Sequence, residues 1–250
     1  QASPAAGCRG LSRLCSSSPG ERSLPGGRGA AAMNVFRLCG DMLHVLSIML
    51  LLYKLHKNKN CVGVSCRTQE IYALVFLLRY ADLMWSFVSI YNSIMKSLFI
   101  ISTLYLIYIM RRQPPVATTY DREKDNFPHE LYHIPPSLVL GVLTAHEWNV
   151  PEVMWTVSIW LESVAIYPQL ALLQQLREVE NLTSDFVGAM GAYRALYILN
   201  WVYRYMEDGH YNWVGWAGGT VQTLLYVDFF YYYVKSKMLG NKLLLPETPV

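Results

Sequence analysis

Residues 34–53 read NVFRLCGDMLHVLSIMLLLY, an apolar run long enough for one helix to cross the roughly 30 Å hydrocarbon core of a bilayer. Four further stretches of similar length follow, at 70–90, 151–173, 185–205 and 213–233. Two shorter ones, at 97–110 and 134–146, lie on either side of the charged segment 111–130, and we count both as spans. The chain is therefore predicted to be an all-α membrane protein with seven transmembrane helices.

The composition agrees with this fold class. Of the 250 residues, 53% are hydrophobic and 16% are charged, and the charges are segregated between the apolar runs, as in polytopic membrane proteins. The net charge of +3 is too small to indicate nucleic-acid binding, and no basic stripe supports it. The five cysteines have neither metal-ligand spacing nor a disulfide pattern, and no nucleophile–base pair indicates an enzyme.

Residues 1–32 differ from the rest of the chain, because they are rich in Gly, Ser, Ala, Pro and Arg and contain no run that can insert. An Arg- and Ser-rich, acid-poor segment is also typical of transit peptides. Met33, however, opens the first span directly. We therefore interpret residues 1–32 as a disordered extension, for which translation from upstream of the true start is one explanation, 33–234 as the membrane domain and 235–250 as a cytosolic tail.

The basic residues of the connections predict the orientation of the spans. The odd-numbered connections and the C-terminal end are basic; they carry Lys54, Lys57, Lys59, Arg67, Arg111, Arg112, Arg122, Lys124, Arg177, Lys235, Lys237 and Lys242. The even-numbered connections carry only Lys96 and, at a helix end, Arg204. We therefore expect a cytosolic C-terminus and a lumenal or extracellular N-terminus. The sequon at Asn181 then lies on the cytosolic side and is not expected to be glycosylated.

A short internal similarity indicates how the spans are arranged. LLRYADL at 77–83 and AYRALY at 192–197 each lie inside a long span. Helices one to three and five to seven are accordingly predicted to form two like-oriented three-helix bundles joined by the fourth helix, as in SWEET or PQ-loop transporters. The similarity is short, so a chance match is the alternative.

Ionisable residues inside the spans need a reason, because a charge at the centre of a membrane helix costs roughly 2.5–3.5 kcal/mol. They are Arg37, His44, Arg79, Asp82, Glu152, Glu162, Arg194, Arg204 and Asp228. One explanation is structural pairing. Arg79 and Asp82 are three residues apart and share a helix face, so they can neutralise each other. Arg194 and Asp228 are expected to pair between helices.

An anion site is the other explanation for some of these charges. Arg37 and Arg204 lie near the lumenal ends of their spans and, with Arg79 deeper, would form a cationic cavity open to the lumen. Arginines at helix ends often only snorkel to the interface. The neighbouring aromatic residues favour a site instead; they are Tyr80, Trp155, Tyr197 and Trp201. The guanidinium fork binds carboxylates in a bidentate way.

His44 follows Arg37 by two helical turns and therefore points to the same side of the first helix. A histidine in an apolar span is usually just hydrogen-bonded to a neighbour. It is also the side chain that titrates between neutral and mildly acidic pH. Protonated His44 beside an anion site would favour binding, and its deprotonation would favour release. Both interpretations stay open on the residues alone.

Several separate motifs resemble the KDEL/HDEL receptor family of the endoplasmic reticulum. They are MNVFRLCGDMLH at 33–44, RYAD at 79–82, Trp155 followed by ESVAIYPQ at 162–169, YRALYILNWVYR at 193–204, and QTLLYVDFFY at 222–231. The resemblance runs from Met33 to about Pro246, with a plant- or alga-like segment at 120–125. It implies a receptor that recaptures escaped endoplasmic-reticulum proteins by a C-terminal Lys/His-Asp-Glu-Leu signal.

The resemblance also implies roles for the charged residues. The residue matching Arg79 takes the terminal carboxylate with help from Tyr80, and those matching Arg37 and Arg204 take the two acidic side chains. The positions around the basic first residue of the signal are Asp82, Glu152, Trp155 and Trp201. The residue matching His44 is the proton sensor. Those matching Glu162 and Tyr193 form a hydrogen bond that tightens on protonation. Binding is thus expected in the mildly acidic Golgi and release in the endoplasmic reticulum, without a cofactor.

Members of this family cycle between the endoplasmic reticulum and the cis-Golgi, and report occupancy by exposing cytosolic lysines to the COPI coat. Lys235, Lys237 and Lys242 are the matching tail residues here, but their spacing departs from the animal pattern. Asn212 stands where animal members carry an acid, and Glu147 replaces Asp. The expected partners are therefore signal peptides, the coat and the lipid bilayer, with no nucleic acid.

Two other classes of membrane protein compete with this interpretation. A small-molecule transporter of the PQ-loop or SWEET type also fits Pro168-Gln169 and the two-bundle arrangement, but it needs a pathway open to both sides. A G-protein-coupled receptor fits only the number of helices. The chain lacks an Asp/Glu-Arg-Tyr at the end of the third span and an Asn-Pro-x-x-Tyr in the seventh.

Overall fold

The computed structural model describes residues 34–84, 86–87, 89–209 and 211–246. The extension predicted at residues 1–32 lies outside this part of the chain. The elements, in order, are α1 (Val35–Asn58), α2 (Cys66–Arg79), η1 (Ala81–Met84), α3 (Ile90–Arg112), η2 (Val116–Thr119), α4 (His129–Tyr132), α5 (Ile134–Thr144), α6 (Val150–Val164), α7 (Tyr167–Leu176), β1 (Glu178–Val179), α8 (Asn181–Asp208), α9 (Trp213–Leu239) and β2 (Leu243–Leu244). The elements η1 and η2 are single turns of 3₁₀ helix.

Every predicted span overlaps a helix. The ambiguous third span is α3, a helix of 23 residues, and the fourth is α5, which follows the single turn α4. Within the described residues, three helical segments are long and apolar enough to cross a membrane: Val35–Asn58, Ile90–Arg112 and Val150–Leu176. The last of these comprises α6 and α7. Pro168 lies in the first turn of α7, where its missing N–H costs little and its ring ends the preceding helix.

Polar residues set the ends of the helices. Five helices begin directly after a polar residue whose side chain accepts a hydrogen bond from the backbone N–H of the third helical residue. These helices are α1, α2, α3, α6 and α9, and their caps are Asn34, Ser65, Ser89, Asn149 and Asn212. At the C-terminal ends of α8 and α9, Gly209 and Gly240 adopt positive φ angles of 63° and 66°. Five helices therefore begin after a polar cap, and two end at a glycine.

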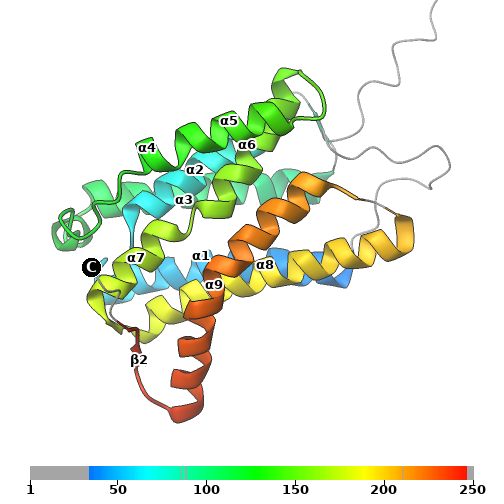
Figure 1. The fold of residues 1–250 in the computed structure, drawn as a ribbon. Helices are drawn as coiled ribbons and strands as arrows, with labels where there is room; N and C mark the ends of the chain where they lie inside the picture. The colour runs from blue at the N-terminus through cyan, green and yellow to red at the C-terminus, as the bar shows by residue number, and fades with distance from the viewer. Residues whose placement is uncertain (1–33, 85, 88, 210, 247–250) are drawn as a thin grey trace, which may run out of the picture.

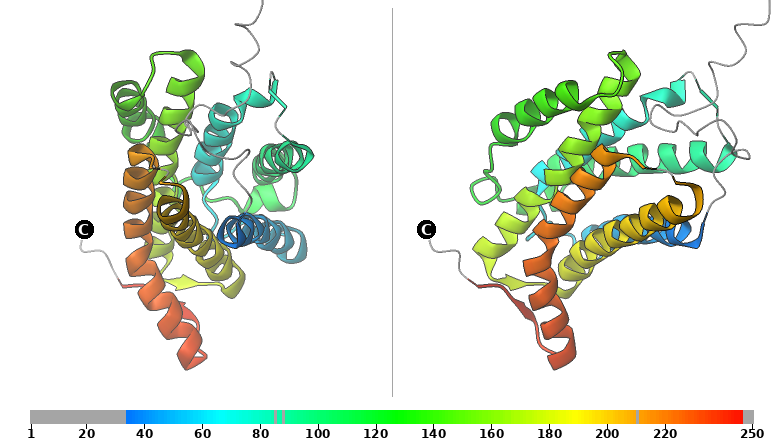
Figure 2. Two further views of the ribbon diagram at one scale, coloured as in Figure 1. Left: turned by 90° about the vertical axis from the view of Figure 1, so that its right-hand side faces the viewer. Right: turned by 45° about the vertical axis from the view of Figure 1, so that its right-hand side comes forward.

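The helices pack as an open bundle in which distant segments lie side by side (Figures 1 and 2). α1 runs along α8, α5 runs along α6, and α2 lies against both α3 and α6, while α9 packs on α6 and α8. α5 and α6 approach closely because Gly141 has no side chain: a Cβ there would lie 2.7 Å from the Cα of Val157. Many large apolar side chains on the outside are exposed, including Ile101, Leu143 and Leu224. An apolar exterior of this extent is what a bilayer covers.

The C-terminal segment begins as a continuation of α9 and ends in a short strand. α9 continues to Leu239, beyond the predicted end at residue 233. β2 then pairs antiparallel with β1, and the Leu245 N–H donates to the Arg177 carbonyl at 3.0 Å. Leu243 and Leu245 are buried. Residues 243–245 therefore pack against the connection between α7 and α8, as Figure 1 shows at β2.

Candidate functional site

Glu162 on α6 is the centre of a buried charge cluster. Its side chain forms ion pairs with Arg79 from α2 and Arg194 from α8. The Tyr193 hydroxyl also donates a hydrogen bond to Glu162 Oε1, at 2.9 Å. Glu162 and Arg194 are 4% and 6% exposed, so this cluster is shielded from solvent. One carboxylate faces two guanidinium groups, and the cluster therefore keeps a positive charge.

Arg79 is held so that part of its guanidinium is available. Its Nε donates to Ser158 Oγ at 3.1 Å, and its Nη1 is bound to Glu162. Nη2 is buried and has no hydrogen-bond partner among the described residues. A buried donor without an acceptor costs about 1–3 kcal/mol, and a carboxylate is the acceptor that a guanidinium binds best. The geometry thus leaves one donor group ready for an anion.

His44 lies beside this cluster, as the sequence predicted. Its ring stacks on Tyr193 with centroids 4.3 Å apart and on Phe99 at 4.5 Å, and it is 7% exposed. Tyr193 is the residue that donates to Glu162. A charge on the imidazole would therefore arise next to the hydrogen bond expected to act in the switch.

Asp82 forms a second pair, and the expected pair of Arg79 with Asp82 is wrong. Asp82 is buried, and its Oδ2 lies 2.6 Å from Lys96 Nζ of α3. The reason is a break in the helix: α2 ends at Arg79, and Asp82 lies in the following turn η1, so the two residues do not share a helix face. Arg79 turns toward α6 instead.

The expected pair of Arg194 with Asp228 is not present either. Arg194 binds Glu162, and Asp228 is exposed on α9. The neighbouring residues Tyr226 and Phe229 are 1% and 3% exposed, so they occupy the inward face of α9. The rotation of α9 therefore turns Asp228 outward.

Comparison with known proteins assigns the family. The family model described as ER lumen protein retaining receptor matches residues 60–204. The ER lumen protein-retaining receptor of Plasmodium falciparum is 56% identical, over 86% of this chain and 98% of that protein. Receptor A of Arabidopsis thaliana is 50% identical and that of Drosophila melanogaster 47%, each over 86% of this chain and all of the relative. This chain belongs to the ER lumen protein retaining receptor family.

Membership of the ER lumen protein retaining receptor family confirms the resemblance read from the motifs. The family is one of receptors and not of enzymes, and the comparisons give no support to the transporter alternative. Relatives from an apicomplexan, a plant and a fly all match over most of the chain, so the plant-like segment is a minor feature.

Asp41 is a member of the site that sequence reasoning missed. It is buried on α1 between Arg37 and His44, and its carboxylate accepts hydrogen bonds from Tyr197 of α8 and, at 2.9 Å, from Tyr91 of α3. A residue four after Arg37 and three before His44 lies on the same helix face as both. Helical spacing was therefore the signal that could have found it.

The remaining predicted ligand residues lie on the same helices as the cluster. Arg37 is half-buried on α1, one turn before Asp41. Trp201 has its ring centre 6.0 Å from the Arg194 guanidinium. The other three are Glu152, buried in the first turn of α6, the half-buried Trp155 on the next turn, and the half-buried Arg204 on α8. Among the described residues, no group of His, Cys, Asp or Glu could hold a metal ion.

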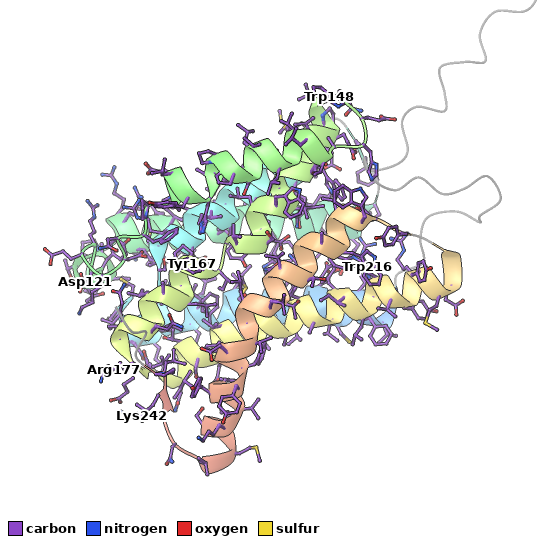
Figure 3. The ribbon with its side chains drawn as sticks, in the orientation of Figure 1. Asp121, Trp148, Tyr167, Arg177, Trp216 and Lys242 are labelled. Carbon is purple, nitrogen blue, oxygen red and sulfur yellow. The ribbon has the colours of Figure 1, made fainter. Side chains whose placement is uncertain are left out.

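The tail lysines lie at the end of the molecule that is opposite to Trp148 (Figure 3). Figure 3 places Trp148, before α6, at one end, and Arg177 and Lys242 at the other. Lys237 Nζ is 2.6 Å from Asp185 Oδ1, and Lys242 is bound to Glu178. The Glu178 carboxylate raises the pKa of Lys242 above its ordinary value. Lys235 lies over the Tyr231 ring, with 5.9 Å from its Nζ to the ring centre.

Proposed function

We propose that this chain is a pH-dependent receptor for the C-terminal Lys/His-Asp-Glu-Leu signal of soluble endoplasmic-reticulum proteins. It binds them in the Golgi and returns them in COPI vesicles. The observation that carries the proposal is the buried Nη2 of Arg79, which has no partner among the described residues. A free C-terminal carboxylate is the group that completes this guanidinium. Family membership supplies the class of cargo.

The charge of the site fits a signal with three negative groups. Arg79 and Arg194 share one carboxylate, so the cluster attracts anions. Arg37 lies in the first turn of α1, and Arg204 lies near the C-terminal end of α8. In these places they suit the two acidic side chains of the signal. Attraction of opposite charges is stronger here than in water, because the surroundings are largely apolar.

A proton links binding to the compartment. His44 stacks on Tyr193, and Tyr193 donates to Glu162, so protonation adds a positive charge beside the anion site. The faces of Tyr193 and Phe99 also stabilise a cation. Mild acid therefore favours the occupied receptor and neutral pH favours release, and no cofactor is needed.

The packing supports two like-oriented bundles. In the two predicted bundles, α1, α2 and α3 correspond in order to α6, α8 and α9. The contact of α1 with α8 then corresponds to that of α6 with α2. The contact of α2 with α3 likewise corresponds to that of α8 with α9. Arg79 and Arg194, the arginines of the two similar segments, both bind Glu162. In the proposed arrangement the site lies between the halves. The basic connections support a lumenal N-terminus and a cytosolic C-terminus.

The tail contacts suggest how occupancy reaches the coat. Asp185 holds Lys237 from the first turns of α8, and the same helix carries Tyr193 and Arg194 in the site. A shift of α8 against α9 on binding would separate Lys237 from Asp185. The freed lysines would then be available to COPI.

The test is peptide binding to isolated membranes. A peptide ending in His-Asp-Glu-Leu is compared with its C-terminally amidated form, at mildly acidic and at neutral pH. We expect binding only for the free acid, and weaker binding at neutral pH. Equal binding of the amidated peptide would exclude Arg79 as the carboxylate site. Sugar uptake into proteoliposomes without peptide binding would favour a transporter.

A further inference from the structure

Lys96 places a cation of the protein itself on Asp82. It lies on the second turn of α3, and its side chain is 16% exposed. Its Nζ is 2.6 Å from Asp82 Oδ2 and 5.7 Å from the centre of the Tyr80 ring. An ammonium group between a carboxylate and an aromatic face is held by both charge and the ring quadrupole. Asp82 and Tyr80 are therefore built as an ammonium subsite.

The subsite has room for another donor. Asp82 Oδ1 is buried and has no hydrogen-bond partner among the described residues, whereas Oδ2 also accepts from Ser86 Oγ at 3.4 Å. A carboxylate has about four acceptor positions, and leaving a buried oxygen without a donor is unfavourable. Lys96 thus binds only the Oδ2 atom of Asp82 and leaves Oδ1 without a donor.

We propose that Lys96 is an internal occupant of this ammonium subsite and competes there with the basic first residue of the retrieval signal. This inference rests on the proposed function and deepens it. An incoming cation must share Asp82 with Lys96, at the cost of repulsion between like charges, or displace it. Lys96 therefore sets how strongly the receptor distinguishes a basic first residue from a neutral one.

The test compares two free-acid peptides, ending in Lys-Asp-Glu-Leu and Ala-Asp-Glu-Leu, at one mildly acidic pH. The readout is the ratio of their affinities, because removing a positive charge from the cavity weakens both peptides through their shared acidic groups. In Lys96→Met the ratio in favour of lysine is expected to rise by about threefold to tenfold, the range for relieving one partly buried charge contact. Lys96→Arg keeps the charge and should leave the ratio near that of the unmodified receptor.

Lys57→Met is the matched control, since it removes an exposed lysine from the last turn of α1 and should leave the ratio unchanged. Lys96→Met leaves Asp82 without its cation and can destabilise the receptor. The double variant Asp82→Asn with Lys96→Met avoids this. It should prefer the lysine peptide less than Lys96→Met does but not lose the preference entirely, because Glu152, Trp155 and Trp201 remain, and it should still reject the amidated forms.

The outcomes separate this inference from the function on which it rests. If the unmodified receptor does not prefer the free acid to the amide, the proposed function fails. If it does, but the ratio in Lys96→Met stays the same or falls, Lys96 does not compete for Asp82 and the inference is overturned. A double variant that prefers lysine as strongly as Lys96→Met does would overturn it as well, because Asp82 would then not be the group that the incoming lysine uses.

Discussion

Arg79 makes two contacts through separate nitrogen atoms, which a point charge could not make in the same way. Its Nε and Nη1 are bound within the protein, and its Nη2 is buried without a partner among the described residues, where we propose that the ligand carboxylate binds. Lysine at this position would keep the charge but could not make these bonds in parallel. We expect Arg79→Lys to weaken binding of the free-acid peptide by at least about tenfold and to abolish its advantage over the amide. Equilibrium binding of the two peptides measures this. Arg112→Lys, at an exposed position of α3, is the control and should retain the advantage.

His44 can be tested without removing its packing, because phenylalanine is also a flat ring. His44→Phe should keep the stacking on Tyr193 and Phe99 but lose the titratable group. Protonation favours binding of an anionic ligand, so affinity falls with rising pH in the unmodified receptor. In the variant the affinity should change little between mildly acidic and neutral pH. Full pH dependence would remove the sensor role. His56→Phe, at an exposed position, is the control, and its peptide affinity should keep the pH dependence of the unmodified receptor.

At the scale of elements, the contact of α8 with α9 depends on a small residue. A Cβ on Gly219 would lie 2.8 Å from Trp201 Cη2, so Gly219→Ala must push this indole out of place. Overpacking of this kind costs about 1–3 kcal/mol. We expect a lower unfolding temperature in detergent and weaker peptide binding. Gly215→Ala on the same helix is the matched control, because its nearest neighbour is Asn212 Oδ1 at 3.7 Å. Equal stability of the two variants would contradict this packing.

The elements also show what the sequence can predict. The spans were predictable because apolar runs of this length are rare outside membranes, and all seven overlap helices. The ends of the helices were not predictable from hydropathy. α9, for example, runs to Leu239 through the polar residues Lys235 and Lys237. The charged site residues could be named because buried charges need a reason. Their partners could not, because pairing depends on helix rotation and on the break after Arg79, neither of which leaves a pattern in the chain.

For the molecule as a whole, α8 connects the site with the tail. Tyr193 and Arg194 lie near the middle of α8, and Asp185, near its start, pairs with Lys237 in the last turn of α9. Asp185 and Glu178 form ion pairs with Lys237 and Lys242 in the structure. If occupancy moves α8 against α9, bound peptide should break these ion pairs and free the two amines. We expect a free-acid peptide at mildly acidic pH to speed their modification by an amine-reactive reagent, detected by mass spectrometry of the purified receptor.

The amines of Lys237 and Lys242 should also be free without peptide when the two carboxylates that pair with them are replaced by amides. Asp185→Asn combined with Glu178→Gln removes both ion pairs but leaves the anion site intact, so Lys237 and Lys242 should react fast in either state. Lys124, which pairs with Asp121 within the connection after α3, is an internal control and should react at one rate throughout. Because the ion pairs are exposed to solvent, each holds the tail only weakly. A small movement of α8 is then enough to release it. Peptide-independent rates in the unmodified receptor would mean that occupancy is not transmitted to the tail.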